Sequence, residues 1–93
     1  MFVVAARCDL HLPDAGSLKG KRSILNRLKD RLRNATAAAV AEVDHNELWQ
    51  RAALGLAVVS GEASHADELL RAARRVIESE PSVVLLDWHV ERF

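Results

Sequence analysis

The residues best suited to chemistry lie together in one short segment. Asp44, His45 and Glu47 place an imidazole between two carboxylates, and such a group can transfer protons because histidine titrates near neutral pH. Adjacent residues of an extended strand point to opposite faces, however, which would separate Asp44 from His45. We interpret the segment as a candidate functional connection, with a structural turn capped by Asp44 as the alternative. Its predicted residues are Asp44, His45, Glu47, Trp49 and Arg51.

A second group of residues is cationic. Between Leu18 and Asn34, seven Lys and Arg residues are opposed by Asp30 alone. In a helix, one row of this segment would carry four cations and an amide, and such a row can follow a phosphate backbone. Ser17 is a good N-cap, and the helix N-terminus behind it could receive a phosphate. The alternative is a solvated face whose long side chains cover the core edge. The predicted anion-binding residues are Ser17, Lys19, Lys21, Arg22, Asn26, Lys29 and Arg33.

The sequence lacks the motifs of several enzyme classes. The segment around Gly20 is not a P-loop, because position 15 is not glycine. We find no HExxH or CxxC motif, no dinucleotide fingerprint and no hydrolase elbow. His11 and His89 are interpreted as scattered strand charges, so we predict no metal and no cofactor. Alternation directs Cys8 toward the core, which predicts a buried, unreactive thiol.

Length and composition indicate one small domain, residues 1–93. The 13 basic and 13 acidic residues cancel, so that any attraction to nucleic acid must come from how the charges are distributed. One cysteine cannot form an internal disulfide. The first charge, Arg7, comes too early for a signal peptide, and no apolar run approaches the roughly 18 residues of a membrane span. We therefore expect a cytoplasmic protein without membrane contact.

Hydrophobic periodicity predicts six elements. The segment from Ala37 to Asp44 is a weak edge strand, with an extension of the preceding helix as the alternative. Arg51 to Ser60 is apolar on both faces, as expected of a central strand. Ser64 and Asp67 resemble a capping box for the second helix. The predicted order is strand Phe2 to Leu12, helix from Ser17 to about Asn34, strands Ala37 to Asp44 and Arg51 to Ser60, helix to about Glu80, and strand Val83 to Phe93.

This order predicts an α+β, ferredoxin-like βαββαβ sandwich, in which a four-stranded antiparallel sheet carries two helices on one face. The first and third strands would be central. The open face of the sheet would lack the aromatic residues with which RRM domains stack bases. That face, or an edge strand, could also form a homodimer. The charged residues expected there are Arg7, Asp9, His11, Glu42, Asp44, Asp87, His89 and Glu91.

Two segments resemble the signatures of a known family. The first is Leu18-Lys19-Gly20-Lys21-Arg22, preceded by Pro13 and Ser17, and the second runs from Val40 to His45 and continues at Leu48 to Ala52. In this order, and over nearly the whole chain, they resemble the YlxP-like family. The resemblance implies a ferredoxin-like fold in a bacterial protein of unknown function. Genes of that family often lie beside genes for translation initiation and ribosome maturation.

We therefore predict a non-enzymatic binding module that contacts RNA or a ribosomal particle through its basic first helix, alone or as a homodimer. One alternative is a small enzyme or ligand-binding protein with a site at the Asp44–His45 connection. The other is a structural factor for protein–protein assembly.

Overall fold

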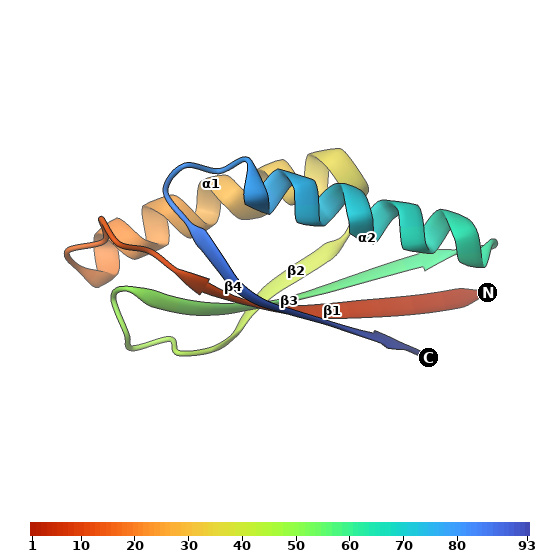
Figure 1. Ribbon diagram of the computed structural model, residues 1–93, viewed down its shortest axis with the longest axis horizontal. Coiled ribbons are helices and arrows are strands. Elements are labelled where there is room, and N and C mark those ends of the chain that lie inside the picture. Colours follow the sequence, from red (N-terminus) through yellow and green to blue (C-terminus); the bar gives the residue numbers. More distant parts are fainter.

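The computed structural model describes residues 1–93, and it has the predicted order of elements (Figure 1). The strands are β1 (Phe2–His11), β2 (Ala39–Asp44), β3 (Arg51–Ser60) and β4 (Val84–Arg92), and the helices are α1 (Leu18–Thr36) and α2 (Ala63–Glu78).

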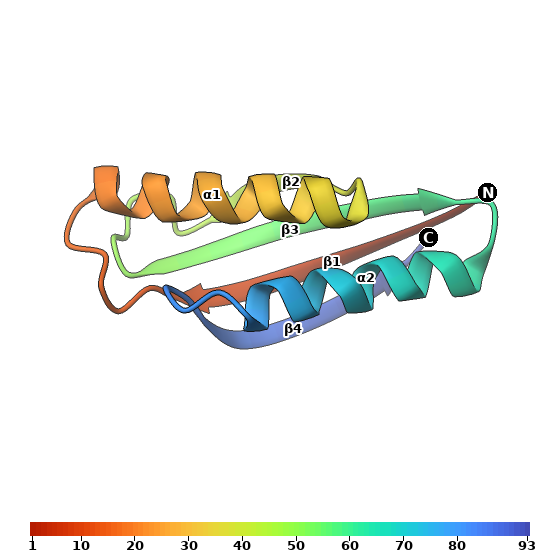
Figure 2. The same ribbon diagram turned by 90° about the horizontal axis from the view of Figure 1, so that it is seen from above.

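The four strands form one twisted sheet in the order β2-β3-β1-β4, with every neighbouring pair antiparallel. Both helices lie side by side on one face and leave the other face open (Figures 1 and 2). β1 and β3 are central, as predicted. The ferredoxin-like architecture expected from the sequence is therefore confirmed.

The core lies between the sheet and the two helices. Alternate residues of β1 point into it, and the apolar stripes of both helices close it from above. Cys8 is fully buried there, and this burial raises the pKa of its thiol to about 12. The largest contributors are the leucines Leu10, Leu12, Leu25, Leu28, Leu32, Leu54, Leu56 and Leu70, with Ile77.

The end of α1 differs from the prediction. The helix continues past Asn34 to Thr36, whose hydroxyl donates a hydrogen bond of 2.6 Å to the carbonyl of Leu32. Ala37 then takes the left-handed conformation, with φ at 55°, and caps the helix. The segment that follows is a strand, so the alternative of a longer helical extension is wrong.

The two helix N-termini contrast with one another. The Ser17 hydroxyl accepts a hydrogen bond of 3.0 Å from the backbone N–H of Gly20, as an N-cap does. A Cβ atom at Gly20 would lie 3.3 Å from that hydroxyl oxygen, a tight contact that glycine avoids. In α2 the predicted capping box is wrong, because the helix starts at Ala63 and Ser64 already belongs to its first turn.

Neither helix combines the length and apolar character needed to cross a bilayer.

Candidate functional site

A β-bulge near the end of β2 divides the acidic residues of this strand between the two faces of the sheet. Glu42 pairs with Leu54 and Asp44 pairs with Ala53, so Val43 is an extra residue. The Glu42 side chain points to the same face as that of Val40 and lies under α1, whereas the Asp44 side chain lies on the open face. The prediction of Glu42 on the open face is therefore wrong. The alanine-rich pattern of β2 did not indicate which face was buried, and simple alternation cannot anticipate a bulge.

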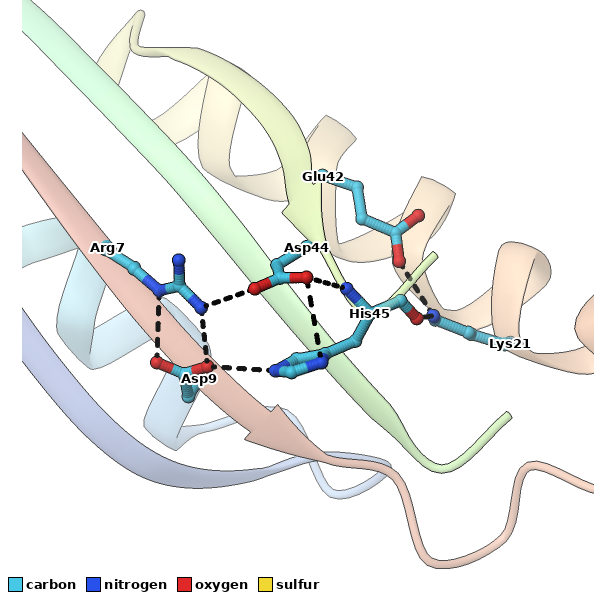
Figure 3. A network of polar contacts seen from close by, with 6 residues as sticks. All are labelled: Arg7, Asp9, Lys21, Glu42, Asp44 and His45. Atoms are coloured by element: carbon cyan, nitrogen blue, oxygen red, sulfur yellow. Dashed lines mark hydrogen bonds and ion pairs between the residues drawn. The ribbon is translucent and has the colours of Figure 1, made fainter. Parts of the chain in front are cut away.

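His45 has a left-handed backbone, with φ at 62°, which few residues other than glycine adopt. The Asp44 carboxylate accepts a hydrogen bond of 2.8 Å from the backbone N–H of His45. This conformation places the imidazole over the open face beside two carboxylates (Figure 3). Its Nε2 lies 3.6 Å from Oδ1 of Asp9, and its Nδ1 lies 3.9 Å from Oδ1 of Asp44. Asp44 and His45 therefore share one face, which an ordinary strand would not allow.

Arg7 joins the two carboxylates from β1. Its guanidinium donates to both oxygens of Asp9 and to Oδ2 of Asp44, each at 3.3 Å. The His45 backbone N–H, followed by this guanidinium, holds the pKa of Asp44 below its usual value. The small residue Ala53 makes the contact possible, because it lies in register between Asp9 and Asp44 on the intervening strand.

Lys21 supports the connection from the helix side of the sheet. It is only 1% exposed, and its Nζ donates a hydrogen bond of 2.7 Å to the carbonyl of His45. The same atom lies 2.7 Å from Oε2 of Glu42, in an ion pair that lacks hydrogen-bond geometry. Lys21 therefore cannot contact an external anion, and its predicted role in anion binding is wrong. It anchors the left-handed turn at His45.

The remaining residues of the predicted connection do not join this cluster. Glu47 makes no hydrogen bond or ion pair through its side chain, and Trp49 is 54% exposed. Arg51 begins β3 opposite His11, and its Nε is buried without a partner. The candidate site therefore consists of Arg7, Asp9, Asp44 and His45, with Lys21 and Glu42 beneath it.

Sequence reasoning missed the role of Gln50. Its Nε2 donates to the carbonyls of Pro13 and Ala15, at 3.2 and 3.4 Å, and its own carbonyl accepts from the N–H of Leu12 at 2.9 Å. These bonds tie the β2–β3 connection to the loop before α1. No local pattern marks such a residue, because its partners are distant in sequence.

The arrangement at His45 places an imidazole within 4 Å of two carboxylates, those of Asp9 and Asp44. Its ring makes no hydrogen bond, however, and its charged neighbours are the carboxylates of Asp9 and Asp44. A hollow on the open face is lined by Arg7 but not by Asp9, Asp44 or His45. The geometry thus describes a polar network around a turn, and the hollow reaches this network only at Arg7.

The cations of α1 fall into two groups. Arg27 and Arg31 donate to the two oxygens of the buried Glu80 carboxylate, at 3.1 and 2.9 Å. Burial alone would raise the pKa of Glu80, but the hydrogen bonds from both arginines outweigh it and leave this pKa lowered. These arginines, like Lys21, have structural partners.

The predicted row on the outer flank of α1 remains accessible. Lys19, Arg22 and Asn26 are exposed, Lys29 is half-buried, and none of the three cations among them makes an ion pair. Arg33, at the end of the row, donates to the carbonyl of Val40 at 3.1 Å. The structure therefore keeps the row together but ties its last member to the edge strand β2.

Residues 3–90 match the family described as "Protein of unknown function (DUF503)". The chain belongs to this family. It is 33% identical, over 78 residues, to a Bacillus subtilis (strain 168) protein named "Uncharacterized protein YlxP", a match that covers 84% of this chain and 85% of the relative. The resemblance to the YlxP-like family is confirmed.

Solved structures similar to this member of the DUF503 family include two designed proteins. One is "De novo designed protein Ferredog-Diesel", at a TM-score of 0.52 and 11% identity, covering 96% of this chain and 83% of the design. The other is the designed protein LFR1 1 with a ferredoxin fold, at a TM-score of 0.52 and 14% identity, covering 100% of this chain and 84% of the design. At such identities the likeness concerns the fold alone.

Proposed function

We propose that this DUF503 family member is a non-enzymatic binding module that contacts structured RNA, free or within a ribosomal particle, through the outer flank of α1. The observation that carries the proposal is the separation of charge. α1 holds seven of the 13 basic residues and one of the 13 acidic residues, so its formal charge is +6 and that of the rest of the chain is −6. A chain without net charge can therefore present a strongly positive surface.

The pairing of the α1 cations supports the same proposal. Lys21, Arg27 and Arg31 are held by internal carboxylates, which leaves Lys19, Arg22 and Lys29 without an ion-pair partner on one row of the helix. Successive positions of such a row lie about one helical turn apart, roughly 5 Å. Phosphates along one strand of a duplex recur about every 3.4 Å of its axis, so a row of cations along a helix can contact several of them together and release counterions.

An acid–base enzyme at His45 is less well supported. The imidazole stands beside carboxylates without a hydrogen bond, and the hollow on the open face ends short of it. The homodimer, the ribosomal partner and the cytoplasmic location stay predictions.

The test is a titration of a labelled RNA hairpin, and separately of purified ribosomal subunits, with the protein at several salt concentrations. We expect saturable binding. The logarithm of the association constant should fall linearly with the logarithm of the salt concentration. In the double variant Arg22→Glu and Lys29→Glu, the salt slope should fall by about 2, which corresponds to about one lost phosphate contact per residue.

The matched control is Arg71→Glu with Arg75→Glu, which changes the charge equally on exposed positions of α2 that make no ion pair. Affinity should stay much closer to wild type in this control. Equal losses in both double variants would mean that total charge, and not the α1 row, governs binding. No binding by the wild-type protein at low salt would remove the proposal.

A further inference from the structure

The open face of the sheet contains an apolar hollow that the proposed RNA contact does not use. It has a volume of about 470 Å³ and is open to solvent. Several of the residues that line it are small, so the sheet surface is accessible to another backbone. They belong to strands β1, β2 and β3: Ala5, Ala39, Ala41, Val43, Gly55 and Ala57.

Val43 shapes this hollow through the β-bulge. The bulge directs its side chain over Gly55, where a Cβ atom would come within 2.9 Å of Cγ1 of Val43. Val43 is nevertheless 51% exposed, and Val59, on the same face, is 61% exposed. The face therefore offers apolar area that the fold itself does not cover.

The charges around the hollow are predominantly negative. Glu91 lines it beside His89, and the Arg7 guanidinium is shared between the carboxylates of Asp9 and Asp44. Asp87 makes no ion pair, although it lies directly opposite Asp9 in the register of β1 and β4. Like charges placed directly opposite each other destabilise a sheet. A cation supplied from outside would relieve this repulsion.

We propose that this open face docks an amphipathic helix of a partner protein, with an apolar stripe in the hollow and Lys or Arg residues at its acidic edge. Helices bind grooves in this way through apolar side chains at i, i+3, i+4 and i+7. The carboxylates of Asp9, Asp44 and Asp87 on this face would attract a basic segment, whereas the positive charge of α1 would repel it. A second copy of this chain fits less well, because two open faces would bring their carboxylates together.

The proposal can be tested with a labelled 18-residue peptide of leucine and lysine, patterned as an amphipathic helix. Two control peptides are required, one with glutamate in place of lysine and one with the same composition in scrambled order. We expect saturable binding of the patterned lysine peptide, measured by fluorescence anisotropy, and at least about tenfold weaker binding of both controls.

Two variants locate the binding. Ala57→Arg fills the hollow from its floor, and Asp87→Lys reverses an exposed charge on β4, two residues before His89, which lines the hollow. Each should weaken the lysine peptide about tenfold or more, whereas the α2 control Arg71→Glu with Arg75→Glu should not weaken it. Thermal unfolding of each variant shows whether it is folded, and Asp87→Lys keeps the test valid if Ala57→Arg is not.

Three results would overturn the proposal. The first is no binding of the patterned lysine peptide. The second is that the scrambled peptide binds as tightly as the patterned one, or that the folded variants bind the patterned peptide as tightly as the wild-type protein does. The third is a wild-type dimer, detected by analytical ultracentrifugation, that dissociates in Asp87→Lys or Ala57→Arg, because the occupant of the face would then be a second copy.

Discussion

Two ion-pair clusters hold α1 to the rest of the molecule, and they are built in opposite ways. At Lys21 the cation is buried and reaches a partly exposed carboxylate, Glu42, together with the carbonyl of His45. At Glu80 the carboxylate is buried and two exposed arginines of α1 reach it from outside. Long exposed side chains keep part of their hydration, whereas a buried ammonium has only its protein partners. The two clusters should therefore differ in how much stability depends on them.

The largest effect is expected at Lys21. Lys21→Ala leaves Glu42 and the His45 carbonyl without their partner and opens space in the core, so we expect a loss of about 3–5 kcal/mol in the free energy of unfolding. Urea unfolding monitored by circular dichroism measures this loss. A change below about 1 kcal/mol would show that water replaces the ammonium, and the contrast between the two clusters would disappear.

A smaller loss is expected at Glu80. Glu80→Gln removes a charge from two hydrogen-bonded pairs but keeps the shape of the side chain, so we expect a loss of about 1–3 kcal/mol near pH 7, measured in the same way.

The pH dependence at Glu80 follows from its lowered pKa. A carboxyl with a lower pKa in the folded state contributes stability above its unfolded pKa, about 4.3, and loses this contribution as the pH falls through the folded value. The difference between wild type and Glu80→Gln should thus shrink below about pH 4.3. A difference that stayed constant between pH 7 and pH 3 would mean that the charge of Glu80 is not what stabilises the fold.

A variant of His45 tests the role of Lys21 further, because Lys21 anchors the left-handed backbone conformation of His45. Glycine accepts a left-handed φ, whereas a β-branched residue does not. We expect His45→Val to be about 1–2 kcal/mol less stable than His45→Gly. Equal thermal stability of the two variants would show that the left-handed turn is not maintained in solution.

The smallest effect is expected on the outer row of α1. Arg22→Ala and Lys29→Ala should each change the free energy of unfolding by less than about 0.5 kcal/mol, because neither residue has an ion-pair partner. Arg31→Ala is the matched comparison on the same helix and should cost more, since it loses its bond to Glu80. Equal costs for all three would remove the division between structural and available cations.

Several features were predictable from local sequence because they depend on periodicity and capping. Alternation in β1 predicted its buried face and the burial of Cys8. The apolar character of β3 predicted its central position in the sheet, and Ser17 predicted the start of α1. Of the candidate site, Asp44 and His45 were singled out as residue types, although alternation predicted that they would point to opposite faces, and the outer row of α1 was recognised from its helical spacing.

Only the tertiary structure determined how the charged side chains are used. A single bulge sends Glu42 and Asp44 to opposite faces, and a left-handed residue returns His45 to the side of Asp44. Lys21 and Lys29 are both lysines of one helix, yet only Lys21 is buried against the end of β2. Residue type and helical spacing determine which face a side chain occupies, whereas its partner depends on which distant strand lies under that face. The sequence by itself therefore determined that α1 is basic, and the packing of α1 against the sheet decided which of its cations remain available.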